Sequence, residues 1–191
     1  MPQPTEQENR DEQVPNEKKL DDLYALIDDM EIAMMTTRRP DGYLVSRPMA
    51  TQERQADVDL WFVTNADAHK LDELEHDPHV NLGYYKDRTR EWVSVSGTAR
   101  ISTDRAKIHE LYAPDWRAWF GDEGGARDGG PDDPRIRLIF VDAHSVTYQK
   151  KDRPMPLVLF SIAKGIVTGE PPKTGDLREL GERELHAGRG R

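Results

Sequence analysis

Two short segments of this chain contain residue types that bind a charged or planar group. In the first, Arg47 follows Ser46 in an extended stretch, and Pro48 and Met49 come directly after it. Proline has no N–H for a sheet ladder, so the strand is interrupted here and leaves backbone groups free for a planar ligand. Taken alone, Arg47 is also typical of a solvated arginine at a sheet edge.

The second segment, residues 62–70, joins a strand that ends at Thr64 to a helix that begins a few residues later. The first amides of such a helix, the Thr64 hydroxyl and the Lys70 ammonium could converge on one anion. A phosphate, with a charge of roughly −1.5 to −2, would fit this corner. The same order is also ordinary for a strand–loop–helix connection, and the anion interpretation gains weight if Arg47 comes from the neighbouring strand.

Aromatic residues offer a surface for a flat ligand. Trp92, Ser94 and Ser96 alternate along a predicted strand and therefore share one face of it. One indole and two hydroxyls suit the edge of a heteroaromatic ring, and they also suit a strand side that faces solvent. Trp116 and Trp119 lie three residues apart on a predicted helix. Such clusters are usually core, but this one could also cover a planar ligand or a subunit seam.

The sequence lacks the fingerprints of several other functions. It contains no GxGxxG or GxxxxGK[ST] loop, no HExxH and no GxSxG. It has no cysteine, which excludes a disulfide scaffold, an iron–sulfur cluster and a cysteine nucleophile. His76 and His79 flank Pro78, which breaks any helix that would put both imidazoles on one face, so we predict no metal site.

Charge and hydropathy narrow the class of partner. The chain has 27 Lys and Arg against 36 Asp and Glu, a net charge of −9, which argues against a nucleic-acid partner. No apolar run approaches the ~20 residues that span a bilayer, so we predict no membrane partner. Residues 1–19 lack the apolar stretch of a signal peptide. We therefore expect a cytoplasmic protein.

The elements that must position these residues are mostly short strands. Leu20, Leu23, Ile27 and Met30 recur at helical spacing and predict a helix over residues 18–30. The Pro40–Gly42 turn signal joins two strands of a hairpin. The predicted strands cover residues 32–37, 43–51, 59–64, 79–86, 91–101, 135–142 and 145–149, and the remaining helices cover 67 to just before 78, 104–111 and 112–120.

This order of elements predicts an antiparallel barrel, because the strands follow one another in hairpin-like succession without regular βαβ alternation. Residues 1–17 carry almost no apolar side chains and are predicted to be a disordered N-terminal tail. Residues 18–173 form the predicted domain, whose last apolar stretch is 155–168, and residues 174–191 are predicted to be a polar C-terminal tail.

The segments taken in order resemble the pyridoxamine 5′-phosphate oxidase-like superfamily of FMN-binding split barrels, and most of all its bacterial general stress protein branch. The resemblance covers residues 18–173 and depends on order and spacing rather than on one motif. The segments that carry it are SRPM at 46–49, FVTN at 62–65, HK at 69–70, EWVSVSG at 91–97, YAPxxxxWF at 112–120, GPDDP at 130–134 and VTGEPP at 167–172.

The resemblance implies a mainly β (α+β) fold, an antiparallel six-stranded split β-barrel of Greek-key type with flanking helices. It also implies a homodimer with two FMN molecules in clefts shared between the subunits. By position, it implies that the cofactor-binding residues are Arg47, Pro48, Met49, Val63, Thr64, His69, Lys70 and Trp92. If the tryptophan cluster covers a planar ligand, Trp119 is a further residue in contact with the flavin.

This chain departs from the vitamin B6 oxidases of the superfamily in several places. His69 replaces an Arg, Trp92 stands at the position of a Gln, and Gln52 stands at the position of a Lys. The oxidases also end in an Arg-Leu-[His/Ser]-Asp-Arg substrate motif that the last residues here do not match. Vitamin B6 oxidation is therefore not expected.

The main hypothesis is an FMN-dependent redox protein of unknown substrate, with no catalytic side chain of its own, because a flavin carries hydride or electrons itself. A second hypothesis is a non-enzymatic flavin-binding stress protein that stores or senses the cofactor. A third is a deazaflavin- or haem-binding relative, for which His69 is the candidate axial ligand.

Overall fold

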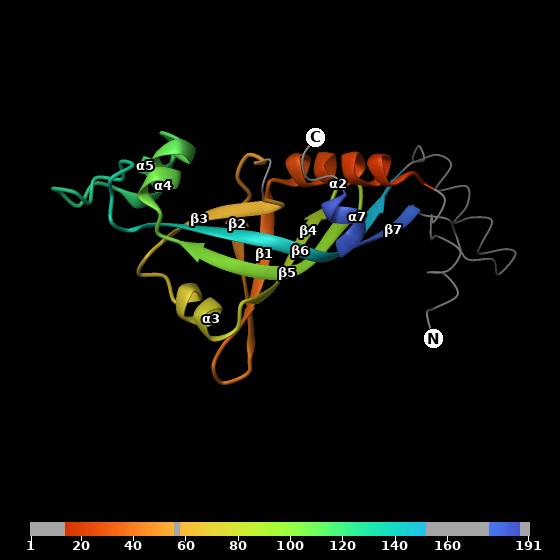
Figure 1. Ribbon diagram of the computed structural model, residues 1–191, viewed down its shortest axis with the longest axis horizontal. Coiled ribbons are helices and arrows are strands. Elements are labelled where there is room, and N and C mark those ends of the chain that lie inside the picture. The colour runs from red at the N-terminus through yellow and green to blue at the C-terminus, as the bar shows by residue number, and fades with distance from the viewer. Residues whose placement is uncertain (1–13, 56–57, 152–175, 188–191) are drawn as a thin grey trace, which may run out of the picture.

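The computed structural model describes residues 14–55, 58–151 and 176–187, which form a β-sheet with helices at its two ends and on its faces (Figure 1). In chain order, the elements are α2 (Asn16–Met30), β1 (Ile32–Arg38), β2 (Leu44–Ala50), β3 (Leu60–Asn65), α3 (Lys70–His76), β4 (His79–Lys86), β5 (Glu91–Ser102), α4 (Arg105–Leu111), α5 (Trp116–Phe120), β6 (Ile136–Lys150), β7 (Asp176–Gly181) and α7 (Glu182–His186).

The strands make one antiparallel sheet of seven strands in the order β2-β1-β4-β5-β6-β3, with β7 also paired to β6. The predicted mainly β, antiparallel fold with flanking helices is confirmed, and over the described residues the sheet has seven strands in place of six and its ladder does not close on itself. Past the ends of the ladder, the amide of Gln52 donates to the carbonyl of Trp61, which links the segment after β2 to β3.

The β1–β2 hairpin forms as its turn chemistry predicts. Gly42 has a φ of 87°, a left-handed value that glycine adopts without strain, and its amide donates to the carbonyl of Arg39. In this register Met35 pairs with Arg47 and Thr37 pairs with Val45. Every second side chain of β1 is therefore buried, and Arg47 lies near the buried Thr37.

Two hydrophobic clusters hold the described residues together. The larger one lies between α2 and the sheet, and the smaller one lies under α4 and α5 at the opposite end (Figure 1). In the smaller cluster, the rings of Trp61 and Trp116 meet edge to face with centroids 6.1 Å apart. Trp116 is thus a core residue, whereas Trp119 on the same helix is 84% exposed.

One continuous strand, β6, replaces the two expected at 135–142 and 145–149. The break that the sequence analysis placed between residues 142 and 145 is a bulge in β6, because Ser96 and Gly97 of β5 pair with Ser145 and Ala143 and leave His144 as the extra residue. A Cβ on Gly97 would lie 2.2 Å from the carbonyl oxygen of Asp142, so only glycine fits there. The strand bends at the bulge instead of ending.

The expected polar C-terminal tail is, over residues 176–186, a strand and a helix instead. Leu180 and Leu185 are buried, and the buried Arg178 pairs with the carboxylate of Asp22 on α2. Asp22 also pairs with Lys18 and Lys150. A charged sequence is typical of a solvent-exposed tail, but here the buried charge of Arg178 is paired with Asp22, which lies 156 residues earlier in the chain.

Several other expectations lie outside the described residues. They are the bulk of the predicted N-terminal tail, residues 1–13, and the apolar stretch at 155–168. Helix α2 begins at Asn16, two residues before the expected start. Among the helices in the described ranges, none is both long and apolar enough to cross a bilayer.

Candidate functional site

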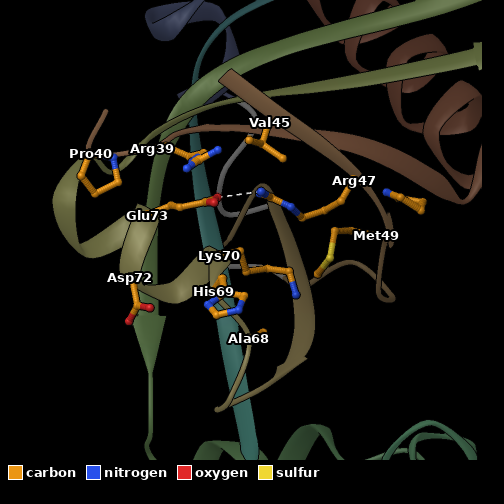
Figure 2. Close-up of a pocket in the computed structure, with 11 residues that line it drawn as sticks. Arg39, Pro40, Val45, Arg47, Met49, Ala68, His69, Lys70, Asp72 and Glu73 are labelled. Atoms are coloured by element: carbon orange, nitrogen blue, oxygen red, sulfur yellow. Dashed lines mark hydrogen bonds and ion pairs between the residues drawn. The ribbon is translucent and has the colours of Figure 1, made fainter. Parts of the chain in front are cut away.

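A hollow of about 820 Å³ opens between β2, the β1–β2 turn and the start of α3 (Figure 2). Its lining contains three basic and two acidic side chains together with an imidazole. The lining residues are Arg39, Pro40, Val45, Arg47, Pro48, Met49, Ala68, His69, Lys70, Asp72 and Glu73. We call this space the charged hollow.

Arg47 is held on one side of the charged hollow by two partners. Its Nη2 lies 2.6 Å from Oε2 of Glu73, and its Nη1 donates to the hydroxyl of Thr37 at 2.5 Å. The Thr37 hydroxyl in turn donates to the same carboxylate oxygen at 2.5 Å. Arg47, Thr37 and Glu73 therefore form a closed triangle of hydrogen bonds between β2, β1 and α3.

Glu73 stays ionised in this triangle although it is largely buried. Burial alone would raise its pKa, but the hydrogen bonds from Thr37 and Arg47 favour the charged form and hold the pKa below its ordinary value. The arrangement is a buried ion pair with good hydrogen-bond geometry, which offsets the cost of desolvating both charges.

Lys70 has a different environment. It begins α3, and its ammonium donates to the hydroxyl of the buried Thr64 at 2.7 Å. Burial lowers the pKa of Lys70, and the nearby positive charge of Arg47 lowers it further. Both effects disfavour the charged ammonium, the charge of Glu73 partly offsets them, and an anion bound beside Lys70 would offset them further.

A second hollow, of about 360 Å³, adjoins the first and shares Pro48 and Met49 of β2 with it. It is mostly apolar and aromatic, and its lining residues are Ile32, Pro48, Met49, Ala50, Gln52, Val63, Thr64, Asn65, Asp115, Trp116, Trp119 and Phe120. We call this space the aromatic hollow. The indole N–H of Trp116 donates to Oε1 of Gln52 at 3.0 Å, which fixes the Gln52 amide at the wall.

The structure brings eight of the nine predicted cofactor-binding residues to these two hollows. Arg47, His69 and Lys70 line the charged hollow, Val63, Thr64 and Trp119 line the aromatic hollow, and Pro48 and Met49 line both. The expectation that Arg47 lies beside the strand–loop–helix corner agrees with this geometry.

Trp92 is the exception, because it lines neither hollow of this chain. Its indole N–H donates to Oε1 of Gln149 at 2.9 Å, and it pairs across the sheet with Tyr85 of β4. Its predicted contact with the cofactor stays a prediction and would require a second copy of the chain.

Sequence reasoning missed Thr37 and Glu73 as parts of the site, and it considered Trp116 only within the tryptophan cluster that could cover a planar ligand. Glu73 follows Lys70 by three residues in α3, so a helical reading puts both on one face, and this spacing was the available signal. Thr37 gave no such signal, because its role depends on the hairpin register. In the ranges that the structure describes, no group of three or more His, Asp or Glu side chains is arranged to hold a metal ion.

With this geometry in view, comparison with known proteins identifies the family. A sequence model described as "Pyridoxamine 5'-phosphate oxidase like" matches residues 18–173. The chain belongs to this family. Protein bli-3 of Neurospora crassa is 39% identical over 189 residues, which are 97% of this chain and 90% of that protein.

Two solved structures have a similar fold. A general stress protein 26 from Jannaschia sp. CCS1 superposes with a TM-score of 0.64 at 22% identity, covering 86% of this chain and 99% of that one. The general stress FMN/FAD binding protein of Xanthomonas citri has a TM-score of 0.58 at 23% identity, covering 72% of this chain and 93% of the other. The resemblance noted from motif order is confirmed at the level of family and fold.

Proposed function

We propose that this chain binds FMN, with the phosphate in the charged hollow and the isoalloxazine ring in the aromatic hollow. The observation that carries the proposal is that the two hollows adjoin across Pro48 and Met49. One end offers Lys70 without a carboxylate partner among the described ion pairs, and the other offers aromatic and aliphatic walls. A ligand with an anionic end and a planar end has this distribution of chemistry.

This proposal assigns a role to four of the lining residues. Lys70 and Thr64 bind the phosphate, and Pro48 and Met49 lie along the ring. The bound flavin would supply the capacity to exchange hydride or electrons, whereas the protein supplies position and electrostatics. The Xanthomonas citri relative is named as a binder of FMN or FAD, which supports a flavin in general.

The outward face of the sheet supports a homodimer. Met34, Tyr85 and Ile32 are large apolar residues at 44%, 57% and 46% exposure, and Ile32 also lines the aromatic hollow. Trp92 pairs directly with Tyr85 and so lies on the same face. A second copy on this face would bury these side chains and bring its own residues to the aromatic hollow. Light scattering on the wild type and on Tyr85→Lys tests this, and a monomeric wild type would contradict it.

We further propose that the protein is a cytoplasmic oxidoreductase of unidentified substrate. Mixing the flavin-loaded protein anaerobically with NADH or NADPH should bleach the flavin absorbance, and adding an electron acceptor should restore it. No bleaching with either nicotinamide would instead favour a flavin-binding protein without this turnover.

The cofactor proposal is tested by titrating FMN, riboflavin and FAD into the apoprotein and following the quenching of flavin fluorescence. Lys70→Ala should weaken FMN about tenfold to hundredfold, since a charge-assisted contact contributes about 1.5–3 kcal/mol. Riboflavin lacks the phosphate, so its affinity should hardly change. Equal losses for FMN and riboflavin would mean that the phosphate binds elsewhere, and a wild type that binds no flavin would overturn the function.

A further inference from the structure

The charged hollow contains an acidic side chain, Glu73, that pairs with one of its three cations, Arg47, while a second cation, the exposed Arg39, pairs with Asp41. We propose that the carboxylate of Glu73 is an internal counter-anion that competes with the ligand phosphate for Arg47 and so leaves Lys70 as the principal phosphate-binding cation. This inference rests on the proposed function and deepens it, because it determines how tightly the phosphate end is held.

The first support is the geometry of the triangle. Glu73 is 8% exposed and Thr37 is 1% exposed, so the carboxylate cannot turn away into water. It contacts Arg47 at 2.6 Å and is pinned by the Thr37 hydroxyl at 2.5 Å. Because the hydrogen bonds keep Glu73 ionised, the positive charge of Arg47 is already compensated before any ligand arrives.

The second support is the contrast with Lys70. Its side-chain hydrogen bond goes to the neutral hydroxyl of Thr64, and the described ion pairs of the hollow join Glu73 to Arg47 and not to Lys70. The charge of Glu73 acts on Lys70 only through space, where it offsets part of the lowering of the Lys70 pKa, and no described ion pair joins the Lys70 ammonium directly to a carboxylate. Figure 2 shows the same division, with Glu73 reaching Arg47 while the Lys70 ammonium lies apart from both.

The Glu73 carboxylate could act on phosphate binding in two opposite ways, and removing its charge distinguishes them. A carboxylate that only positions Arg47 would help the phosphate bind, whereas a competing carboxylate repels the phosphate and weakens its binding. Glu73→Gln retains a similar shape and a carbonyl acceptor for Arg47 and Thr37 but removes the charge. The matched control is Glu75→Gln, an exposed residue of the same helix that does not line the hollow.

The experiment measures the affinities of FMN, riboflavin and inorganic phosphate for each full-length variant. Glu73→Gln should bind FMN about tenfold tighter, with riboflavin unchanged and inorganic phosphate also tighter. Glu75→Gln should leave all three affinities within about twofold of wild type, because an exposed charge is screened. Weaker or unchanged FMN binding by Glu73→Gln would overturn the proposal.

A second variant keeps the test decisive if Glu73→Gln fails to fold with Arg47 left unpaired. The double variant Arg47→Gln/Glu73→Gln removes both charges together and leaves no buried ion without a partner. Its FMN affinity should stay within about threefold of wild type, because the pair carries no net charge. A tenfold to hundredfold loss would show that Arg47 itself holds the phosphate and would refute the competition. The wild-type titration separately tests flavin binding, so a failure of these variants alone refutes only the role of Glu73.

Discussion

Two arginines of this protein, the buried Arg135 and the half-buried Arg47, have opposite relations to their surroundings. Arg135, which precedes β6, is 1% exposed, and all its guanidinium nitrogens donate to Asp133, to Glu123 or to backbone carbonyls. Arg47 uses only its terminal nitrogens for Thr37 and Glu73, and it faces a hollow. A saturated arginine fastens a loop to the sheet, whereas Arg47 shares one carboxylate with Thr37 beside a cavity, where a bound anion would compete with that carboxylate.

The carboxylates of the two regions extend the same contrast. The Arg135 guanidinium, with backbone amides, holds the pKa of Asp133 well below its usual range. In the charged hollow, Arg47 and Lys70 together exceed the single carboxylate of the triangle. A structural ion cluster therefore differs from a binding site in two ways: its hydrogen-bond donors all have partners within the protein, and its positive charge is compensated.

The largest expected effect is the loss of the saturated cluster. Arg135→Ala leaves the buried Asp133 without its partner and several carbonyls without donors, so we expect about 3–5 kcal/mol lower unfolding free energy. Urea denaturation measures it, with Arg88→Ala, an exposed arginine, as the control. Added FMN should not restore the loss. A change below about 1 kcal/mol would erase the distinction between the two arginines.

The cluster around Asp22 gives a pH-dependent test of the same idea. Burial raises the pKa of Asp22, but the hydrogen bonds from Lys150, Lys18 and Arg178 outweigh this effect and lower the pKa to about 2. A lowered carboxyl pKa stabilises the fold above the unfolded pKa near 4, and this stability is lost as the pH falls toward 2. The stability gap between wild type and Asp22→Asn should therefore shrink by about 2 kcal/mol between pH 6 and pH 2. A constant gap would contradict the paired role of Asp22.

The smallest expected effect concerns Lys70 in the apoprotein. Because burial and Arg47 lower the pKa of Lys70, its charged form destabilises the folded apoprotein at neutral pH, and this penalty fades only as the pH rises toward the ordinary lysine pKa. Lys70→Met should raise apoprotein stability by up to about 1 kcal/mol while weakening FMN, a trade of function for stability. A destabilised Lys70→Met would mean that Lys70 belongs with the structural charges.

Local chemistry explains why much of the fold was predictable. The β1–β2 hairpin follows from its turn residues, and helix α4 begins where the Asp104 carboxylate accepts from the amides of Ala106 and Lys107. The corner from Thr64 to Lys70 also formed as expected, with a direct hydrogen bond between the two side chains. Each of these features depends on residues within about ten positions of one another.

The features that the sequence did not predict depend on distant partners. Strand β7 was predicted as a polar tail because the partner of the buried Arg178, Asp22, lies 156 residues earlier in the chain. The sequence analysis gave Glu73 no role, because the register of β1 against β2 is needed to bring Thr37 and Arg47 to it. A single sequence shows residue types, whereas these pairings depend on the topology of the sheet.

The unequal burial of the tryptophans gives the protein an internal optical reporter. Trp61 and Trp116 are each 3% exposed, whereas Trp119, at the mouth of the aromatic hollow, is 84% exposed. Collisional quenchers in solution will therefore reach the Trp119 indole and leave those two core rings emitting. A molecule that settles in the aromatic hollow would shield that one indole, so its arrival can be followed by intrinsic emission without any label.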